Sequence, residues 1–314
     1  MKMSNKICAV LVTFNRKEYL LKELKALEEQ TIFIEKIIVV DNNSTDGTGE
    51  LLKKSGYIKD IISDEITVKY NNRIKFIYFK SSVNTGGSGG FKKAFQLALN
   101  EDCEYIWAMD DDVLPHFDCL ENLLMGMSKN VSVCVPNRNF NSYIDNAVVG
   151  FNWKNPFRPV AVKKTLIVKN ENKFVKDFAF EGPVFKKELI KKIGIPNSDY
   201  FIFFDDSDFA QRCLKETNIL YVANAGLEKQ IIPNSNVKSV FNWRSYYVCR
   251  NEIIFDKLYN KHKIVSTIRP YILLVLRLIK YNIKQNKQAS KYALLAFKDA
   301  KKGNVGKTIE PGSF

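Results

Sequence analysis

Five short apolar runs, separated by helical patterns, fill the first 136 residues and restrict the folds open to this 314-residue chain. The runs cover residues 7–14, 37–41, 74–79, 105–109 and 131–135. They are nearly continuous rather than alternating, as in strands buried on both faces of a parallel sheet. Helical patterns follow the first four runs. This order predicts an α/β fold in which helices flank a mostly parallel sheet.

The pattern changes after Pro136. Short alternating segments over residues 137–180 predict a hairpin or meander, and the chain from about residue 239 onward is helical and basic. We therefore expect a domain over residues 1–240, with halves of about 1–136 and 137–240, followed by a helical basic region over 241–314.

Charge is concentrated in the last part of the chain. The net charge is +14, and residues 261–314 hold twelve basic side chains against Asp299 and Glu310. Such a segment suits nucleic acid, an anionic membrane surface or an acidic partner. No run approaches the roughly 18 apolar residues of a spanning helix, and no secretory signal is visible. Six scattered cysteines without a C-x-x-C pair indicate a reducing cytosol.

Three adjacent carboxylates, Asp110, Asp111 and Asp112, follow the fourth apolar run directly. Neighbouring carboxylates repel one another, and a divalent cation that carries an anionic phosphate ligand relieves the repulsion. Oxygen ligands of this kind suit Mg²⁺ or Mn²⁺. The carboxyl end of a strand is also where open α/β sheets bind ligands. A solvated acidic turn is the alternative.

Three further motifs follow other apolar segments. The glycine loop over residues 84–90 precedes an expected helix over 91–99, and suits phosphate or is a plain flexible turn. Asp41 ends the second run and predicts a contact to a base or ribose, or an Asx turn. Asp205 and Asp206 follow an aromatic run. They suggest a partly desolvated general base, or simple capping of a helix.

Together these motifs resemble family 2 glycosyltransferases of the GT-A fold. The resemblance rests on segments 13–16, 41–46, 84–91, 110–112 and 205–206, in this order, and covers roughly residues 6–255. The glycine loop, together with a Trp-x-x-Tyr-Tyr-x-x-Arg-Asn pattern from Trp243, is nearest to the bacterial galactofuranosyl- and rhamnosyltransferase branch.

The resemblance implies a role for each matching position. Asp206 would be the catalytic base of an inverting transfer, with Asp205 as second choice. Asp110 and Asp112 would hold Mn²⁺ or Mg²⁺ on the donor diphosphate. The nucleotide-sugar would be bound by Thr13, Asn15, Arg16, Asp41, Asn43, Asn84, Gly86, Gly87, Asp110 and Asp111. Trp243, Tyr247 and Arg250 would lie on the acceptor side.

The implied reaction moves a hexosyl unit to a glycan or lipid-linked acceptor in cell-surface polysaccharide synthesis, such as that of a capsule or O-antigen. UDP-galactofuranose is the favoured donor and dTDP-rhamnose the next. Residues 264–283 place apolar side chains at helical spacing with Arg269, Arg277 and Lys280 between them. This pattern suits a helix lying on the inner face of an anionic cell membrane, or a helix packed on the domain. No nucleic-acid partner is expected, and the sequence is compatible with an oligomer.

One departure concerns the metal. The family often supplies a histidine ligand after the general base, but residues 221–236 contain none, and the chain has only His116 and His262. Either Asp112, diphosphate and water hold the metal, or Glu228 substitutes, or metal dependence is weak. The alternatives to a transferase are a silent scaffold and a nucleic-acid or anionic-surface binder that uses the basic tail. A sugar-1-phosphate nucleotidyltransferase would need a glycine-rich loop where residues 13–16 stand.

Overall fold

The computed structural model describes residues 6–71, 73–139, 146–166, 170–231 and 242–312. The strands in these ranges are β1 (Ile7–Thr13), β2 (Lys36–Asp41), β3 (Ile66–Asn71), β4 (Ile74–Lys80), β5 (Tyr105–Asp110), β6 (Val113–Pro115), β7 (Val131–Asn137), β8 (Ala147–Gly150), β9 (Lys164–Leu166), β10 (Lys173–Val175), β11 (Val184–Lys186) and β12 (Asn218–Lys229). The helices are α1 (Lys17–Glu28), α2 (Thr48–Lys54), α3 (Gly86–Asn100), α4 (Cys119–Met125), α5 (Lys187–Ile193), a 3-10 turn η1 (Ser198–Tyr200), α6 (Asp205–Cys213), α7 (Trp243–Tyr259), α8 (Lys263–Ile283) and α9 (Lys287–Lys302).

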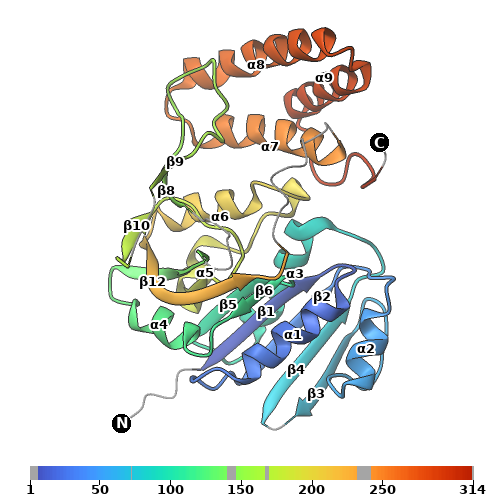
Figure 1. The fold of residues 1–314 in the computed structure, drawn as a ribbon, viewed down its shortest axis with the longest axis vertical. Helices are drawn as coiled ribbons and strands as arrows, with labels where there is room; N and C mark the ends of the chain where they lie inside the picture. The colour runs from blue at the N-terminus through green and yellow to red at the C-terminus, as the bar shows by residue number, and fades with distance from the viewer. Residues whose placement is uncertain (1–5, 72, 140–145, 167–169, 232–241, 313–314) are drawn as a thin grey trace.

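One large sheet forms the body of the molecule (Figure 1). Its strand order is β10-β12-β7-β11-β5-β1-β2-β4-β3, and β6 pairs with β12 outside this path. The central strands β5, β1, β2 and β4 run parallel, as do β7 and β12. The strands β3, β6, β10 and β11 are antiparallel to their neighbours. The predicted α/β fold is confirmed.

Two apolar layers enclose this sheet. Along β1, Cys8, Val10 and Val12 pack under α3, α5 and α6, while Ile7, Ala9 and Leu11 pack under α1, α2 and α4. Because neighbouring residues of a strand point to opposite faces, both sets are buried only when helices cover both faces. This burial explains why the strand runs are continuous in the sequence.

The glycine segment differs from the prediction. It is not a loop before a helix at residue 91, because α3 already begins at Gly86. Gly86 has a φ of +73°, and a Cβ there would lie 2.0 Å from the carbonyl oxygen of Phe201. A Cβ on Gly90 would lie 2.4 Å from Val12 on β1. The glycines therefore let the first turn of α3 approach the sheet and the segment before α6.

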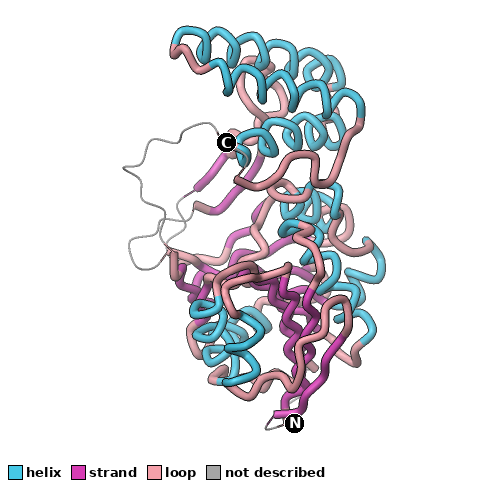
Figure 2. Tube along the Cα trace, turned by 90° about the vertical axis from the view of Figure 1, so that its right-hand side faces the viewer, coloured by secondary structure: helices cyan, strands magenta, loops and turns pink. Residues whose placement is uncertain are grey.

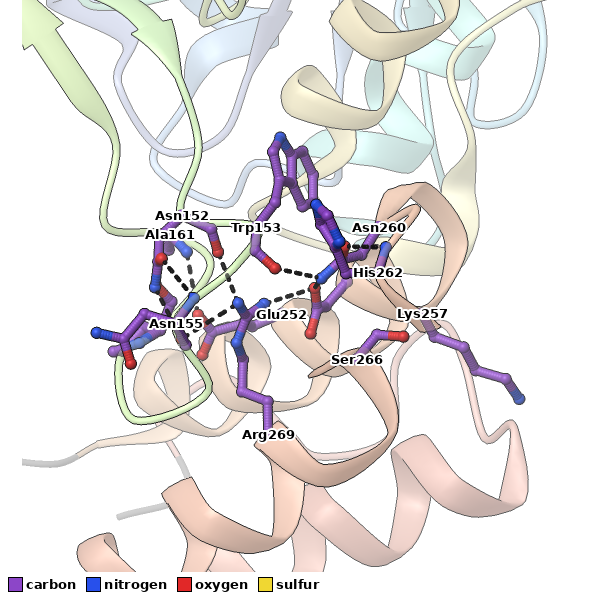
Figure 3. Close-up of polar contacts among 12 residues, drawn as sticks. Asn152, Trp153, Asn155, Ala161, Glu252, Lys257, Asn260, His262, Ser266 and Arg269 are labelled. Atoms are coloured by element: carbon purple, nitrogen blue, oxygen red, sulfur yellow. Dashed lines mark hydrogen bonds and ion pairs between the residues drawn. The ribbon is translucent and has the colours of Figure 1, made fainter. Parts of the chain in front are cut away.

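The C-terminal helices α7, α8 and α9 stack at one end of the molecule, and the edge strand β3 lies at the other end (Figures 1 and 2). The segment between β8 and β9 reaches up to them, and Figure 3 shows the polar contacts that hold it. Arg269 of α8 donates to Asp256 Oδ1 of α7 at 2.6 Å and to the Asn152 carbonyl at 2.7 Å. Asn260 donates to Asp256 and to the Trp153 carbonyl, both at 2.9 Å. The helical region is thus bound to the α/β body by buried polar contacts.

Candidate active site

A cleft of about 620 Å³ opens at the carboxyl ends of β1 and β5, where open α/β sheets bind ligands. Its walls come from the loop after β1, the acidic triple, the first turn of α3 and the start of α6. The structure brings these separate motifs together. The predicted site residues that line the cleft are Thr13, Asn15, Arg16, Asn84, Gly86, Gly87, Asp110, Asp111, Asp112, Asp205, Asp206 and Trp243.

Asp111 fixes the loop after β1. Its Oδ2 accepts hydrogen bonds from Thr13 Oγ1 at 2.7 Å and from the Phe14 amide at 3.1 Å. Its Oδ1 accepts one from Arg16 Nη1 at 2.8 Å. Burial raises the pKa of Asp111, and these partners limit the rise. Because the chain engages both oxygens, Asp111 serves to orient Thr13 and Arg16.

Asp110 and Asp112 are the carboxylates that remain for a ligand. Among the residues the structure describes, none forms a hydrogen bond or an ion pair with the Asp110 carboxylate. Asp112 pairs through Oδ2 with Arg16 at 3.0 Å, and its buried Oδ1 accepts no hydrogen bond in the same part of the chain but lies 3.6 Å from the Lys229 ammonium. Burial and the charges of Glu181 and Asp112 raise the pKa of Asp110 well above its usual range. Two such oxygens fit a divalent cation.

Glu228, the substitute considered for the missing histidine, lies away from these carboxylates. His116 Nε2 lies 3.1 Å from Glu228 Oε1, and neither residue lines the cleft. The described residues contain no group of three His, Cys, Asp or Glu side chains arranged around a metal position. Lys229, the next residue of β12, does line the cleft.

The start of α3 and Asn42 form the opposite wall. Asn42 Nδ2 donates to the Gly86 carbonyl at 2.9 Å and to Asn84 Oδ1 at 3.1 Å. These bonds hold the amino end of α3 against the carboxyl end of β2. The positive end of a helix attracts phosphate, so this wall suits an anionic group.

Asp41 is not at the cleft surface. Its side chain is fully buried, where Oδ1 accepts from the Ser44 amide and Oδ2 from the Tyr78 hydroxyl, both at 2.7 Å. Asn43 lies in the following turn with a φ of 70° and does not line the cleft either. Asn42 therefore occupies the place that the sequence suggested for Asp41.

Asp206 lies where the large cleft meets a second cavity of about 270 Å³. Burial, and then the charge of Asp177, raises the pKa of Asp206 to about 6, and the ammonium of Lys163 opposes this rise. Asp177 and Lys163 line the small cavity and pair with each other. Burial and the charge of Asp206 raise the pKa of Asp205 well above its usual range. A carboxylate with a raised pKa between two cavities suits proton abstraction.

The three residues expected on the acceptor side do not lie together in the structure. Trp243 lines the cleft, as does the neighbouring Arg244. Tyr247 is buried, and its hydroxyl donates to the Ile309 carbonyl at 2.8 Å. Arg250 is fully buried and donates to the carbonyls of Gly306 and Tyr200 at 2.7 and 3.0 Å. Tyr247 and Arg250 therefore hold the C-terminal segment and the turn before α6.

Comparison with known proteins agrees with this arrangement. Residues 8–194, more than half of the chain, match the model of glycosyl transferase family 2. The chain belongs to this family. It is similar to galactofuranosyltransferase GlfT1 of Mycobacterium tuberculosis strain ATCC 25618 / H37Rv, at 24% identity over 215 residues and 68% of this chain. It is also similar to GlfT1 of Mycolicibacterium smegmatis, at 23% identity over 214 residues and 67% of this chain. The matches span 66% and 65% of those relatives.

Solved structures share the fold of this family 2 chain. Mannosyltransferase PcManGT from Pyrobaculum calidifontis, in complex with GDP-Man and Mn²⁺, has a TM-score of 0.55 at 16% identity, covering 95% of this chain and 75% of its own. S. aureus TarS 1–349 with UDP-GlcNAc has a TM-score of 0.55 at 15% identity, covering 94% and 81%. GalNAc-T7 with UDP, GalNAc and Mn²⁺ has a TM-score of 0.61 at 10% identity, covering 96% and 57%. These likenesses establish the GT-A fold.

Sequence reasoning missed several residues that line the two cavities. Asn42 stands in the motif that drew attention to Asp41, so its position could have been found. Glu181, Lys229, Lys163 and Asp177 belong to segments without a local signal. They come together only in the assembled fold, because they stand beside four different strands: β9, β10, β11 and β12.

Proposed function

We propose that this family 2 chain is an inverting glycosyltransferase that uses a nucleotide-sugar donor. The observation that carries the proposal is the position of Asp206 between two cavities, with Asp110 and Asp112 lining the larger one. The larger cleft takes the donor, and the small cavity takes the acceptor sugar. Asp206 accepts the proton of the acceptor hydroxyl, whose oxygen bonds to the anomeric carbon as the bond to the diphosphate breaks. Attack from the opposite side inverts the anomeric configuration.

Charged side chains of the protein stabilise the leaving diphosphate. Arg16 lines the cleft and is oriented by Asp111 and Asp112. Mn²⁺ or Mg²⁺ would be held by Asp110 and Asp112, together with phosphate and water, and supplies charge neutralisation to the departing diphosphate when bound. The structural relatives PcManGT and GalNAc-T7, both in complex with Mn²⁺, support this choice of ion.

UDP-galactofuranose is the donor that we favour, and dTDP-rhamnose the next. The GlfT1 relatives support the first choice, together with the glycine-rich start of α3. The acceptor that we propose is a glycan or lipid-linked sugar, and the process is synthesis of a cell-surface polysaccharide such as a capsule or O-antigen. The small cavity, at about 270 Å³, suits one sugar ring rather than an oligosaccharide.

The surface of α8 supports a membrane-bound setting for this reaction. No helix among the described residues is long and apolar enough to span a membrane. The inward face of α8 carries Arg269 and Arg277, which pair with Asp256 and Glu252 of α7. Its outward side exposes apolar residues: Ile264, Ile268, Val275, Leu276, Ile279 and Ile283.

Charge favours an anionic bilayer as the partner of this outward side. Helix α8 contains no acidic residue, and Lys261, Lys263, Lys280 and Lys284 are exposed along it. A second copy would bring the same positive charge and be repelled, whereas anionic lipids attract it. The proposed setting is the cytoplasmic face of the cell membrane.

Ile264→Asp/Ile283→Asp should abolish sedimentation with phosphatidylglycerol vesicles, and Val68→Asp on β3 should not. Equal sedimentation of the two variants would contradict the membrane proposal.

Calorimetric titration of the purified protein with UDP and with dTDP, each with and without Mn²⁺, tests the donor assignment. We expect one nucleotide to bind, and Asp110→Asn/Asp112→Asn to lose the part of its affinity that depends on Mn²⁺. Binding of neither nucleotide under either condition would contradict the transferase proposal.

A further inference from the structure

Lys229 is placed beside the acidic triple by the pairing of two strands. The last residues of β12 run antiparallel to β6, and Lys229 stands opposite Val113, which follows Asp112 directly. The Lys229 ammonium lies 3.6 Å from Asp112 Oδ1, and its side chain is only 11% exposed. Lys229 also lines the large cleft. The strand register therefore fixes a positive charge at the centre of the site, in the segment where a histidine was expected.

The ammonium of Lys229 has hydrogen-bonding capacity that the described chain does not use. It carries three N–H donors. One donates to Glu181 Oε1 at 2.6 Å, and the distance to Asp112 is too long for a second hydrogen bond. Two donors thus remain without a partner in the part of the chain that the structure describes. A nearly buried ammonium with unused donors is costly unless a ligand accepts from it.

The surrounding charges show which ligand suits these donors. Asp111 and Asp112 are already compensated by Arg16, and Glu181 pairs with Arg138 as well as with Lys229. The carboxyl of Asp110 also attracts Lys229, but no hydrogen bond joins the two in the described part of the chain, so the two remaining N–H groups stay available to a ligand. An anionic oxygen that enters the cleft would find a fixed cation with free N–H groups. Phosphate oxygens of a nucleoside diphosphate have this chemistry.

We propose that Lys229 binds the donor diphosphate and is a resident cation of the phosphate subsite. Its N–H groups donate to phosphate oxygens in the bound donor and to the same oxygens as negative charge develops on the leaving diphosphate. Because this charge belongs to the protein, part of the diphosphate affinity persists when divalent ions are removed. This inference rests on the proposed function, since it concerns the same donor site.

Titration calorimetry with UDP and with dTDP, in EDTA and in Mn²⁺, tests the proposal on Lys229→Met. Lys187→Met is the matched control, because Lys187 is also buried, donates to the Glu101 carbonyl and does not line the cleft. We expect Lys229→Met to weaken binding of the preferred nucleotide in EDTA by about tenfold to a hundredfold. Lys229→Arg should restore most of the loss, and Lys187→Met should bind like the wild type.

Two further variants keep the test decisive. If Lys229→Met does not fold, Lys229→Gln keeps a polar side chain without the charge and should show the same loss. If Lys229 served only to neutralise Glu181, the double variant Lys229→Met/Glu181→Gln would bind like the wild type, because the charge to be neutralised is gone as well. On our account the double variant keeps the loss seen with Lys229→Met.

The outcomes separate this inference from the function on which it rests. A wild type that binds neither nucleotide even in Mn²⁺ contradicts the transferase proposal itself. A wild type that binds in Mn²⁺ but not in EDTA, or a Lys229→Met variant with the affinity of Lys187→Met, overturns only the role of Lys229.

Discussion

At the scale of single residues, the raised pKa that suits Asp206 to accept a proton also lowers the stability of the folded protein. Its pKa of about 6 arises from burial and from the charge of Asp177. Because the folded state holds this proton more tightly than the unfolded state, its contribution to stability falls as pH rises from about 4 to about 6. Above that range the folded protein carries a buried charge that the unfolded chain would hydrate.

Asp206→Asn should therefore remove transfer activity and stabilise the fold. At pH 7.5 we expect the free energy of unfolding to rise by about 1–3 kcal/mol, because the amide removes a desolvated charge. At pH 3.5 the gain should vanish, since the carboxyl is then protonated in both states. Urea unfolding at the two pH values measures this, with the exposed Asp60→Asn as control. A loss of stability at pH 7.5 would contradict the account.

The pH dependence of kcat/KM follows from the same group. Asp206 must be ionised to accept a proton, so kcat/KM should fall about tenfold per pH unit below about pH 6. The charged groups that face it are Asp205, Asp177, Glu181 and Lys163. Lys163→Met removes the opposing cation and should move the acid limb to higher pH. A limb that stays in place in this variant would show that another group titrates.

At the scale of elements, the turn before α6 is strained, and a side chain of α7 holds it in place. Phe201, Phe203 and Phe204 all have positive φ, a region that costs non-glycine residues energy. Asn251 of α7 donates to the carbonyls of Tyr200, Ile202 and Phe203 at 2.8–3.0 Å. The helix after the α/β body thereby fixes the backbone that presents Asp205 and Asp206.

The start of α3 offers a test with two adjacent glycines. In Gly86→Ala the Cβ would meet the Phe201 carbonyl at 2.0 Å with an unfavourable φ, whereas at Gly87 nothing lies within 4 Å. We expect Gly86→Ala to lower the free energy of unfolding by about 2–4 kcal/mol. Gly87→Ala should change it by less than about 1 kcal/mol. Chemical unfolding of both variants decides this, and equal stabilities would show that the contact with Phe201 is absent.

The sequence predicted the elements whose signals are local. The runs at 7–14, 37–41, 74–79, 105–109 and 131–135 correspond to β1, β2, β4, β5 and β7, because burial on both faces makes a strand continuously apolar. It did not reveal the long strand β12, which places Lys229 at the cleft only through its pairing with β6. Nor did it reveal that Asp41 is held internally by Tyr78, 37 positions away. Such contacts depend on the assembled sheet.

At the scale of the whole molecule, the C-terminal helices are joined to the α/β body through buried charge. Arg269 and Asp256 are each 1% exposed and pair at 2.6 Å, while Arg269 also holds the Asn152 carbonyl (Figure 3). The segment between β8 and β9, which Arg269 anchors, leads to Lys163 in the small cavity. The helices thus support the wall of the proposed acceptor site.

Arg269→Met should destabilise the protein by about 3–5 kcal/mol, because it leaves the Asp256 carboxylate buried without its partner. Urea unfolding measures the loss, and Lys291→Met on the exposed side of α9 should change stability by less than about 0.5 kcal/mol. The double variant Arg269→Met/Asp256→Leu should recover much of the loss. No recovery would show that packing rather than charge dominates this contact.

The central claim concerns group transfer, and product analysis tests it most directly. The wild type and Asp206→Asn are each incubated with UDP-galactofuranose and a galactoside acceptor in Mn²⁺, and released UDP and the anomeric configuration of the product are measured by NMR. The account predicts UDP release and an inverted glycosidic bond with the wild type, and neither with Asp206→Asn. A product that retains the donor configuration, or equal transfer by Asp206→Asn, would contradict it.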